Sequence, residues 1–216
     1  MKKIQIIIPL TVLLITATTT FAQEVVNEMQ YRIELGLSYS PIKKIKFNFN
    51  PEIRFDETFS ADKYVFEGGI EYKPLKFLEL GAHYRYYINP RDNKETQYFN
   101  RYAFSATGKK EFGRFKSELR LRFTNDADDE ITDKKFFRYK LSTAYDIPKC
   151  KITPSVAVEA FQSLGDEGGL YKMRYSAGFD YKLFKKNYIG VSYKFDYYQT
   201  KYLNRHIIKL KYKIKF

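Results

Sequence analysis

Hydrophobic and polar residues alternate with a period of two along most of the chain after residue 23. The last stretch shows the pattern clearly, because Ile208, Leu210, Tyr212, Ile214 and Phe216 are apolar and a lysine occupies each position between them. Successive side chains of a strand point to opposite faces, so the pattern predicts strands with one apolar and one polar face. About eleven such segments, each roughly 9 to 12 residues long, follow one another.

The connections between these segments also alternate, in length and in composition. Short connections lie at 41–44, 73–77, 109–113, 147–151 and 184–187. Longer connections, rich in acidic residues or glycine, lie at 56–62, 89–96, 125–133 and 163–169. A meander with short turns at one end and longer loops at the other is typical of an outer-membrane β-barrel.

Two architectures can use such strands, and they differ in which face is buried. A soluble periplasmic barrel or sandwich turns the apolar face inward, whereas a membrane barrel turns it toward lipid. Segment length favours the membrane barrel, as do the densely charged polar faces and the tyrosines that recur near the ends of the apolar faces. These tyrosines are Tyr31, Tyr39, Tyr72, Tyr86, Tyr98, Tyr171, Tyr181 and Tyr197. We therefore predict an all-β, antiparallel up-and-down transmembrane β-barrel of about 10–12 strands.

The number of strands is harder to predict, because bacterial single-chain barrels have even strand numbers. If the short turns face the periplasm, the first segment, 30–39, runs inward from outside, and only 23–29 precede it. Twelve strands, or eleven with a partial strand from 23–29, are therefore expected, with ten as the alternative.

The first 22 residues have the features of a secretory signal peptide. A positive start, MKK, is followed by the apolar stretch QIIIPLTVLLI, and Thr20 and Ala22 stand at the positions that permit cleavage before Gln23. The apolar stretch is shorter than the roughly 20 residues of a spanning helix, which argues against an uncleaved anchor. We expect a signal peptide at 1–22, a barrel domain at 23–216, and export to the outer membrane of a Gram-negative cell.

Composition supports this interpretation and narrows the partners. Tyr (20) and Phe (19) supply all the aromatic residues, and both favour strands. The formal charge of +13 becomes +11 once Lys2 and Lys3 are removed, but an exported protein does not meet genomic DNA, so no nucleic-acid partner is expected. The single cysteine, Cys150, cannot form an internal disulfide.

The end of the chain suggests how the barrel reaches its membrane. A terminal strand of this alternating kind that ends on phenylalanine resembles the signal read by the outer-membrane assembly machinery. Tyr212, Ile214 and Phe216 are the residues assigned to that signal. Outer-membrane lipid, the assembly machinery and periplasmic chaperones are the expected partners.

The order of motifs resembles an uncharacterised family of Gram-negative, Bacteroidetes-type proteins, the domain of unknown function 2490 (DUF2490). The resemblance rests on PEIRFDE (51–57), the stretch 62–86, NRYAF (100–104), GRFKSELRLRFTND (113–126), FFRYKL (136–141) and the closing strands. It implies an outer-membrane barrel and no particular activity.

The polar faces should line the lumen with charges of both signs. The expected lumen network consists of Glu52, Arg54, Glu67, Glu71, Glu79, His83, Arg85, Arg101, Glu118, Arg120, Arg122, Arg138, Glu159, Arg174, Asp180, Lys194, Asp196, Lys209 and Lys211. Paired charges that fill a small barrel would be structural, and this is the favoured role. A narrow, porin-like channel that prefers small anionic solutes is the alternative, and binding by the extracellular loops is the second alternative.

Catalytic and metal-binding patterns are weak, so no enzyme activity, cofactor or metal is predicted. Nucleophilic hydrolysis needs a serine near an oriented histidine, and the sequence has two histidines. His83 falls on the lumen face, whereas His206 falls on the lipid-facing phase near the outer end of its strand, with Phe195 and Tyr197 rather than serine on the neighbouring segment. The acidic loop 126–133 lacks the spacing of a calcium loop, so a solvated loop is favoured.

Overall fold

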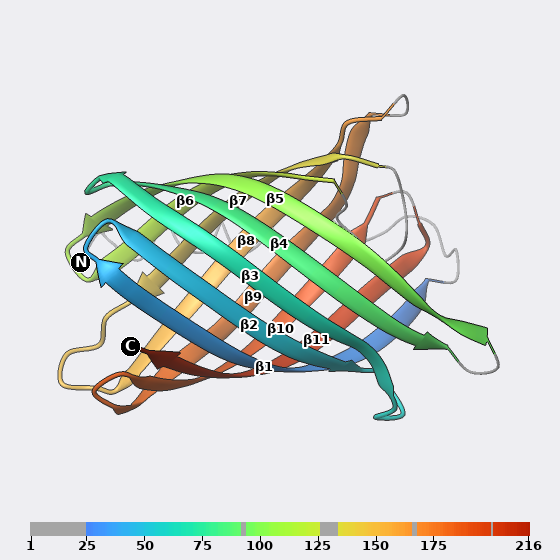
Figure 1. The fold of residues 1–216 in the computed structure, drawn as a ribbon, viewed down its shortest axis with the longest axis horizontal. Helices are drawn as coiled ribbons and strands as arrows, with labels where there is room; N and C mark the ends of the chain where they lie inside the picture. The colour runs from blue at the N-terminus through green and yellow to red at the C-terminus, as the bar shows by residue number, and fades with distance from the viewer. Residues whose placement is uncertain (1–24, 92–93, 126–133, 166–167, 200) are drawn as a thin grey trace, which may run out of the picture.

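The computed structural model describes residues 25–91, 94–125, 134–165, 168–199 and 201–216, and these form one closed β-barrel of eleven strands (Figure 1). The strands are β1 (Val26–Ile42), β2 (Ile45–Phe55), β3 (Ala61–Leu75), β4 (Leu78–Arg91), β5 (Lys94–Phe112), β6 (Phe115–Thr124), β7 (Phe136–Tyr145), β8 (Ile152–Ser163), β9 (Gly169–Phe184), β10 (Asn187–Tyr198) and β11 (Leu203–Lys215). The predicted all-β meander is confirmed, and its strand number lies inside the predicted range. No helix in these ranges is long and apolar enough to span a membrane.

The described residues form eleven strands, an odd number, so of the expected arrangements the structure is nearest to eleven strands with a partial strand, and neither twelve nor ten strands form. Consecutive strands pair antiparallel, which makes β1 and β11 run in the same direction, and they close the barrel as a parallel pair from Val26↔Leu203 to Ser38↔Lys215 (Figure 1). Val26–Met29 form no separate strand, because they are the first residues of β1. A parallel ladder still pairs the edge groups of both strands, so closure does not require a twelfth strand.

Six of the eleven described strands are longer than the predicted 9 to 12 residues, and β5 reaches 19 residues. They continue into the predicted turns, which shrink to two residues at 43–44, 76–77, 113–114 and 185–186. Gly113 has a φ of +58° in one of these turns, a conformation that glycine adopts without strain. We call the end with these turns and 146–151 the short-turn mouth, and the opposite end the long-loop mouth.

The connection 56–60 at the long-loop mouth is held by its own hydrogen bonds. Asp56 Oδ1 accepts hydrogen bonds from the Thr58 hydroxyl at 2.7 Å, the Thr58 amide at 2.9 Å and the Ser60 amide at 3.0 Å. The Thr58 hydroxyl bond, together with the two amides, lowers the pKa of Asp56 below its usual range. The Phe59 ring stacks on Tyr31 with centroids 4.2 Å apart, which fixes this loop against β1.

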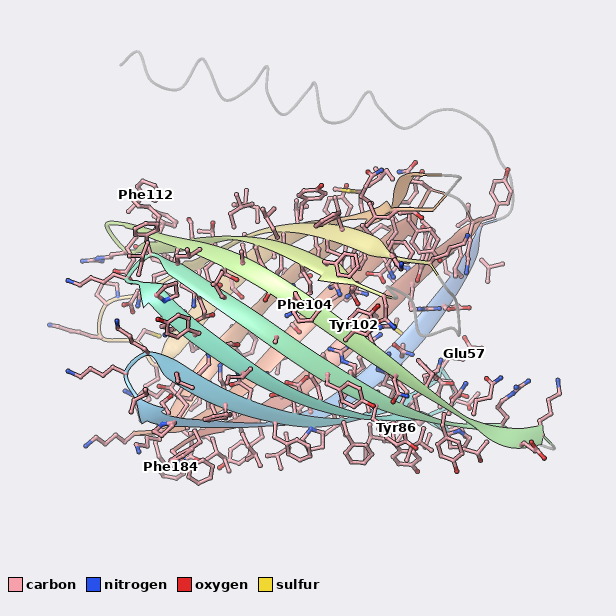
Figure 2. All side chains as sticks on the ribbon, turned by 45° about the horizontal axis from the view of Figure 1, so that its top comes forward. Glu57, Tyr86, Tyr102, Phe104, Phe112 and Phe184 are labelled. Carbon is pink, nitrogen blue, oxygen red and sulfur yellow. The ribbon has the colours of Figure 1, made fainter. Side chains whose placement is uncertain are left out.

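Apolar side chains cover the outside of the barrel, and charged side chains occupy the inside. Tyr102, Phe104, Phe112 and Phe184 project away from the wall in Figure 2, and all four are exposed. The fully buried side chains include Arg54, Lys172 and Asp196, together with several aromatic residues. This arrangement is the reverse of that in a water-soluble domain, which buries its apolar groups and exposes its charges.

The predicted tyrosine positions hold with one clear exception. Tyr39, Tyr72 and Tyr98 are exposed on the outer face near strand ends. Tyr171 is instead 8% exposed and packs inside the barrel with Phe136. The β8–β9 register shifts after Phe161, where Lys172 is followed in the pairing by Leu170, so Tyr171 is left out of the ladder. Such a bulge redirects a side chain, which explains why strict alternation placed Tyr171 on the wrong face.

Candidate functional site: the charged lumen

The lumen brings together a large set of charged residues from all parts of the described chain. The alternation along each strand turns one set of side chains inward, and the whole predicted network lies on that inward set. A central cavity is lined by Glu52, Arg54, Glu67, Glu71, His83, Arg85, Arg101, Glu118, Arg120, Arg122, Arg138, Glu159, Arg174, Asp180, Lys194, Lys209 and Lys211. Glu79 and Asp196 lie outside this cavity, where Glu79 pairs with Lys109 at 3.0 Å and Asp196 is fully buried.

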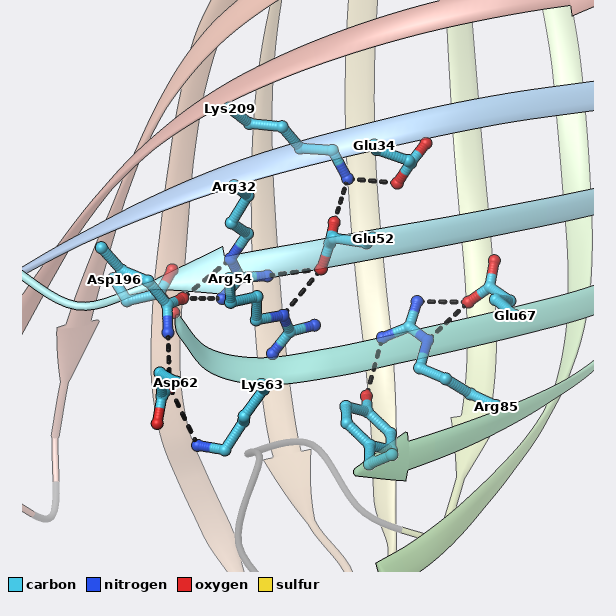
Figure 3. A network of polar contacts seen from close by, with 12 residues as sticks. Arg32, Glu34, Glu52, Arg54, Asp62, Lys63, Glu67, Arg85, Asp196 and Lys209 are labelled. Carbon is cyan, nitrogen blue, oxygen red and sulfur yellow. Dashed lines mark hydrogen bonds and ion pairs between the residues drawn. The ribbon is translucent and has the colours of Figure 1, made fainter. Parts of the chain in front are cut away.

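One ion network joins the parallel pair that closes the barrel (Figure 3). Lys209 on β11 donates to Glu34 on β1 and to Glu52 Oε2 on β2 at 2.6 Å. Arg54 Nε donates to Glu52 Oε1 at 2.7 Å, and Lys211 pairs with Glu34. Two lysines of the last strand therefore hold carboxylates of the first two strands, so the network crosses the closure from the inside.

Other carboxylates are also shared between basic side chains. Arg85 Nε donates to Glu67 at 2.7 Å (Figure 3), and Arg85 Nη1 donates to the Tyr87 hydroxyl at 2.9 Å. Asp196 accepts from Arg174 Nε at 2.5 Å and from Lys172 at 3.2 Å. Buried charges of this kind need such partners, because an unpaired buried charge is costly.

His83 faces the lumen in a space that two glycines leave open. A Cβ added at Gly69 would lie 2.5 Å from His83 Nδ1, and one at Gly81 would lie 2.9 Å from Nε2. His83 Nδ1 has no hydrogen-bond partner among the described residues. The imidazole is therefore positioned by packing, on the wall of the cavity.

Aromatic and aliphatic side chains fill the lumen toward the long-loop mouth. Phe136, Phe161, Tyr171 and Tyr198 form one buried cluster. A second buried cluster is formed by Val65, Tyr87 and Phe99. We call these two clusters the aromatic cap. None of the cap residues lines the cavity, which therefore ends below the cap.

The aromatic cap and the cations of the lumen are joined by cation–π contacts. The guanidinium carbons of Arg101, Arg54 and Arg85 lie 5.0, 5.5 and 5.8 Å from the Tyr87 ring centroid. On the other side, Arg138 lies 4.4 Å and Lys172 Nζ 4.8 Å from the Phe161 ring centroid. Contacts of this kind contribute roughly 0.5–2 kcal/mol each, so the cap also fixes the cations beneath it.

The aromatic cap was not predicted, although the sequence carries a signal for it. Where the lumen is filled by rings, both faces of a strand are apolar, so apolar residues stand next to each other. Such doublets occur at Tyr86–Tyr87, Tyr98–Phe99, Phe136–Phe137 and Tyr197–Tyr198, always toward the long-loop end of the strand. An interruption of the alternation at one end of several strands therefore predicts a closed end of the lumen.

The cavity has a volume of about 860 Å³ and a strong excess of positive charge. Its lining contains 16 lysines and arginines and 6 aspartates and glutamates. Lys46, Lys116 and Lys215 belong to the lining and lie at the short-turn ends of their strands, so the cavity extends to the short-turn mouth. Small-molecule sites usually occupy about 300–1,000 Å³. The lumen can therefore hold an anionic solute.

Metal binding and the surroundings of His206 are the other chemical features considered from the sequence. Within the described ranges there is no group of three or more residues suited to hold a metal ion. On the outer face, Tyr193 Oη lies 2.6 Å from His206 Nδ1, and His206 Nε2 lies 3.4 Å from Asn27 Oδ1. These contacts were not predicted, and they give His206 a tyrosine and an asparagine as neighbours. The acidic loop weighed for calcium, 126–133, lies outside the described residues, as does the predicted signal peptide, 1–22.

A family model connects this architecture with a known group of sequences. The model for a family described as "Protein of unknown function (DUF2490)" matches residues 29–206. The chain belongs to the DUF2490 family. This match covers nearly all of the barrel, from β1 to β11, and it confirms the resemblance found in the sequence of this DUF2490 protein.

The chain was also compared with curated proteins and with solved structures. None of the curated proteins matches the DUF2490 chain significantly. Among solved structures, the β domain of the Bordetella autotransporter BrkA aligns with a TM-score of 0.39 and 13% sequence identity, over 81% of this chain and 82% of that one.

Proposed function

We propose that this DUF2490 protein is an integral outer-membrane barrel. The outer face of every strand carries exposed aromatic or aliphatic residues, and contiguous exposed apolar surface of this extent is foreign to soluble monomers. The strands have 10 to 19 residues, enough for the 9–11 tilted residues that cross a bilayer. The signal-peptide pattern at 1–22 supports export.

Deleting Phe216 is expected to lower the amount of folded barrel in the outer membrane without blocking export. Phe216 is exposed, and its amide donates to the Ser38 carbonyl at 2.8 Å, so its ring is free to be read by the assembly machinery. Folded protein is measured in carbonate-washed membranes as the gel band whose migration changes on boiling. The control is Phe112→Ala, which removes an exposed phenylalanine from the outer face at the same mouth.

Equal loss in both variants would show that the terminal phenylalanine has no special part in assembly. Recovery of the unaltered protein in the soluble periplasmic fraction would overturn the membrane location itself. In that case something other than lipid, such as a partner protein, would have to cover the exposed apolar face.

For the lumen, the proposed function is a narrow passage or vestibule that prefers anions. The observation that carries this proposal is the cavity with 16 basic and 6 acidic lining residues. A purely structural lumen was favoured from the sequence, but paired side chains leave about 860 Å³ open. Because cationic linings select anions in pores, the open space and its charge support the alternative.

The aromatic cap determines how easily solutes pass. The cavity reaches the short-turn mouth, whereas Phe161 and Tyr87, both fully buried, stand between it and the long-loop mouth. Solutes therefore enter from the short-turn side, and conduction requires that the cap move. Truncating one of these rings should widen the passage.

In a planar bilayer with a salt gradient, the purified barrel is expected to show a small conductance with a reversal potential that indicates anion preference. Lys213→Glu should weaken this preference, because Lys213 lines the cavity. Lys185→Glu changes the charge equally in a short turn outside the cavity lining and should have little effect. Phe161→Ala should raise the conductance.

The outcomes separate the possible roles. Cation preference in the unaltered protein would contradict the electrostatic argument. No conductance in either the unaltered protein or Phe161→Ala, with both barrels folded, would reject the channel and leave the structural role or loop binding. That the protein is not an enzyme stays a prediction.

A further inference from the structure

One wall of the cavity, formed by β6 and β7, carries two successive pairs of directly opposed cations. Arg122 stands directly opposite Arg138, and Arg120 directly opposite Lys140. All four line the cavity. Like charges in directly opposed positions destabilise a sheet, so two successive pairs of this kind call for a compensating negative charge.

The protein supplies only part of that charge. Glu159 Oε1 accepts from Arg120 Nη2 at 3.0 Å and from Arg138 Nη2 at 2.9 Å. Arg122 and Lys140 form no ion pair within the described part of the chain. Within the described residues, Glu159 therefore pairs with two of the four cations on this wall, and the other two have no carboxylate within ion-pair distance.

Arg122 gives the strongest evidence that this wall binds a ligand. It is 9% exposed, and its buried Nε has no hydrogen-bond acceptor among the described residues. A buried guanidinium without an acceptor is costly, yet this one lies on the wall of a cavity that solutes can enter. An anion with several oxygens would satisfy it and also screen the like-charge pairs.

We propose that Arg122 and Lys140, supported by Arg120 and Arg138, form a binding site for a phosphate-type oxyanion, either inorganic phosphate or the phosphate group of a small solute. Arginine presents a planar fork that matches the oxygens of phosphate, and lysine adds a point charge. This inference rests on the proposed function in one respect, because the ligand must reach the cavity through the short-turn mouth. To the proposed anion passage it adds the chemical class of the ligand and the residues that bind it.

The site is tested by calorimetric titration of the folded, detergent-solubilised barrel with inorganic phosphate and, separately, with glycerol phosphate, in chloride buffer. The unaltered protein should bind with saturable heat. Arg122→Gln should weaken binding at least tenfold. Arg122→Lys, which keeps the charge and removes the fork, should weaken it by a smaller factor. Arg114→Gln removes the same residue type from a two-residue turn outside the cavity lining and should change the affinity less than twofold.

The experiments can reject the oxyanion site and the channel independently of each other. Saturable binding without any conductance would keep the oxyanion site and reject the channel. Anion conductance without saturable phosphate binding, or equal binding by Arg122→Gln and the unaltered protein, would reject the site and keep the channel. Binding of glycerol phosphate but not of inorganic phosphate would identify a phosphorylated solute as the ligand, and the reverse would identify the free ion.

Discussion

Replacing Lys209 with methionine is expected to destabilise the barrel by about 3 kcal/mol. Lys209 contacts Glu34 and Glu52, and all three side chains are largely removed from solvent. The replacement leaves both carboxylates without this ammonium in the lumen, beside a parallel strand pair that is slightly weaker per residue than an antiparallel one. Arg54 remains on Glu52 and Lys211 on Glu34, which places the cost at the low end for a broken buried pair.

The measurement is urea unfolding in lipid vesicles, followed by the loss of the heat-modifiable band. The chain contains no tryptophan, so this band is preferable to tryptophan fluorescence. Lys116→Met is the matched control, because Lys116 pairs with Asp146 at 3.4 Å in an exposed position, where a pair contributes about 0–1 kcal/mol. An equal effect of the two replacements would show that the closure does not depend on the ion network.

Leu210→Lys, at the very next residue, is expected to destabilise the barrel by roughly 2–4 kcal/mol for a different reason. Leu210 is 45% exposed on the outer face and lies near the middle of β11. In the proposed membrane its side chain lies in hydrocarbon, where a lysine has neither water nor a partner charge. The same unfolding measurement in vesicles detects the change.

Leu75→Lys provides the comparison, since Leu75 is also exposed on the outer face but is the last residue of β3. A lysine near the interface costs only about 0–1 kcal/mol. If both variants lose the same stability, depth in a bilayer does not set the cost. If neither loses stability, the outer face does not lie in lipid.

The sequence predicted the barrel well because one physical signal, the alternation of apolar and polar residues, determines it. At Lys209 and Leu210 the alternation alone assigns one side chain to the lumen and the next to the outside, as the structure has them. The inward positions of the charged residues follow from the same alternation. What each charge contacts did not follow, because the partners of Lys209 lie on β1 and β2, more than 150 residues away in the chain.

Three features depart from a regular alternation and were not predicted. Tyr171 lies on the inner face because a bulge in β9 interrupts the period of two, and a regular alternation in the sequence does not show where a bulge forms. The closure of β1 on β11 depends on the two edges meeting, which is a property of the whole sheet. The aromatic cap left a local signal in doublets such as Phe136–Phe137, but an isolated doublet is ambiguous until the strands that carry it are placed side by side.

The parallel closure has a consequence for the two ends of the barrel domain. The strand β1 starts at the long-loop mouth, whereas β11 ends at the short-turn mouth. In the proposed outer membrane, with the short turns in the periplasm, a peptide fused just before Val26 would be displayed on the cell surface, and one fused after Phe216 would lie in the periplasm. In that orientation the leading end of the chain would have to cross the bilayer during insertion, a step that barrels with an even number of strands avoid. Surface labelling of tags at the two ends would therefore show whether the leading end has crossed the bilayer. This measurement does not depend on whether the lumen binds or conducts anions.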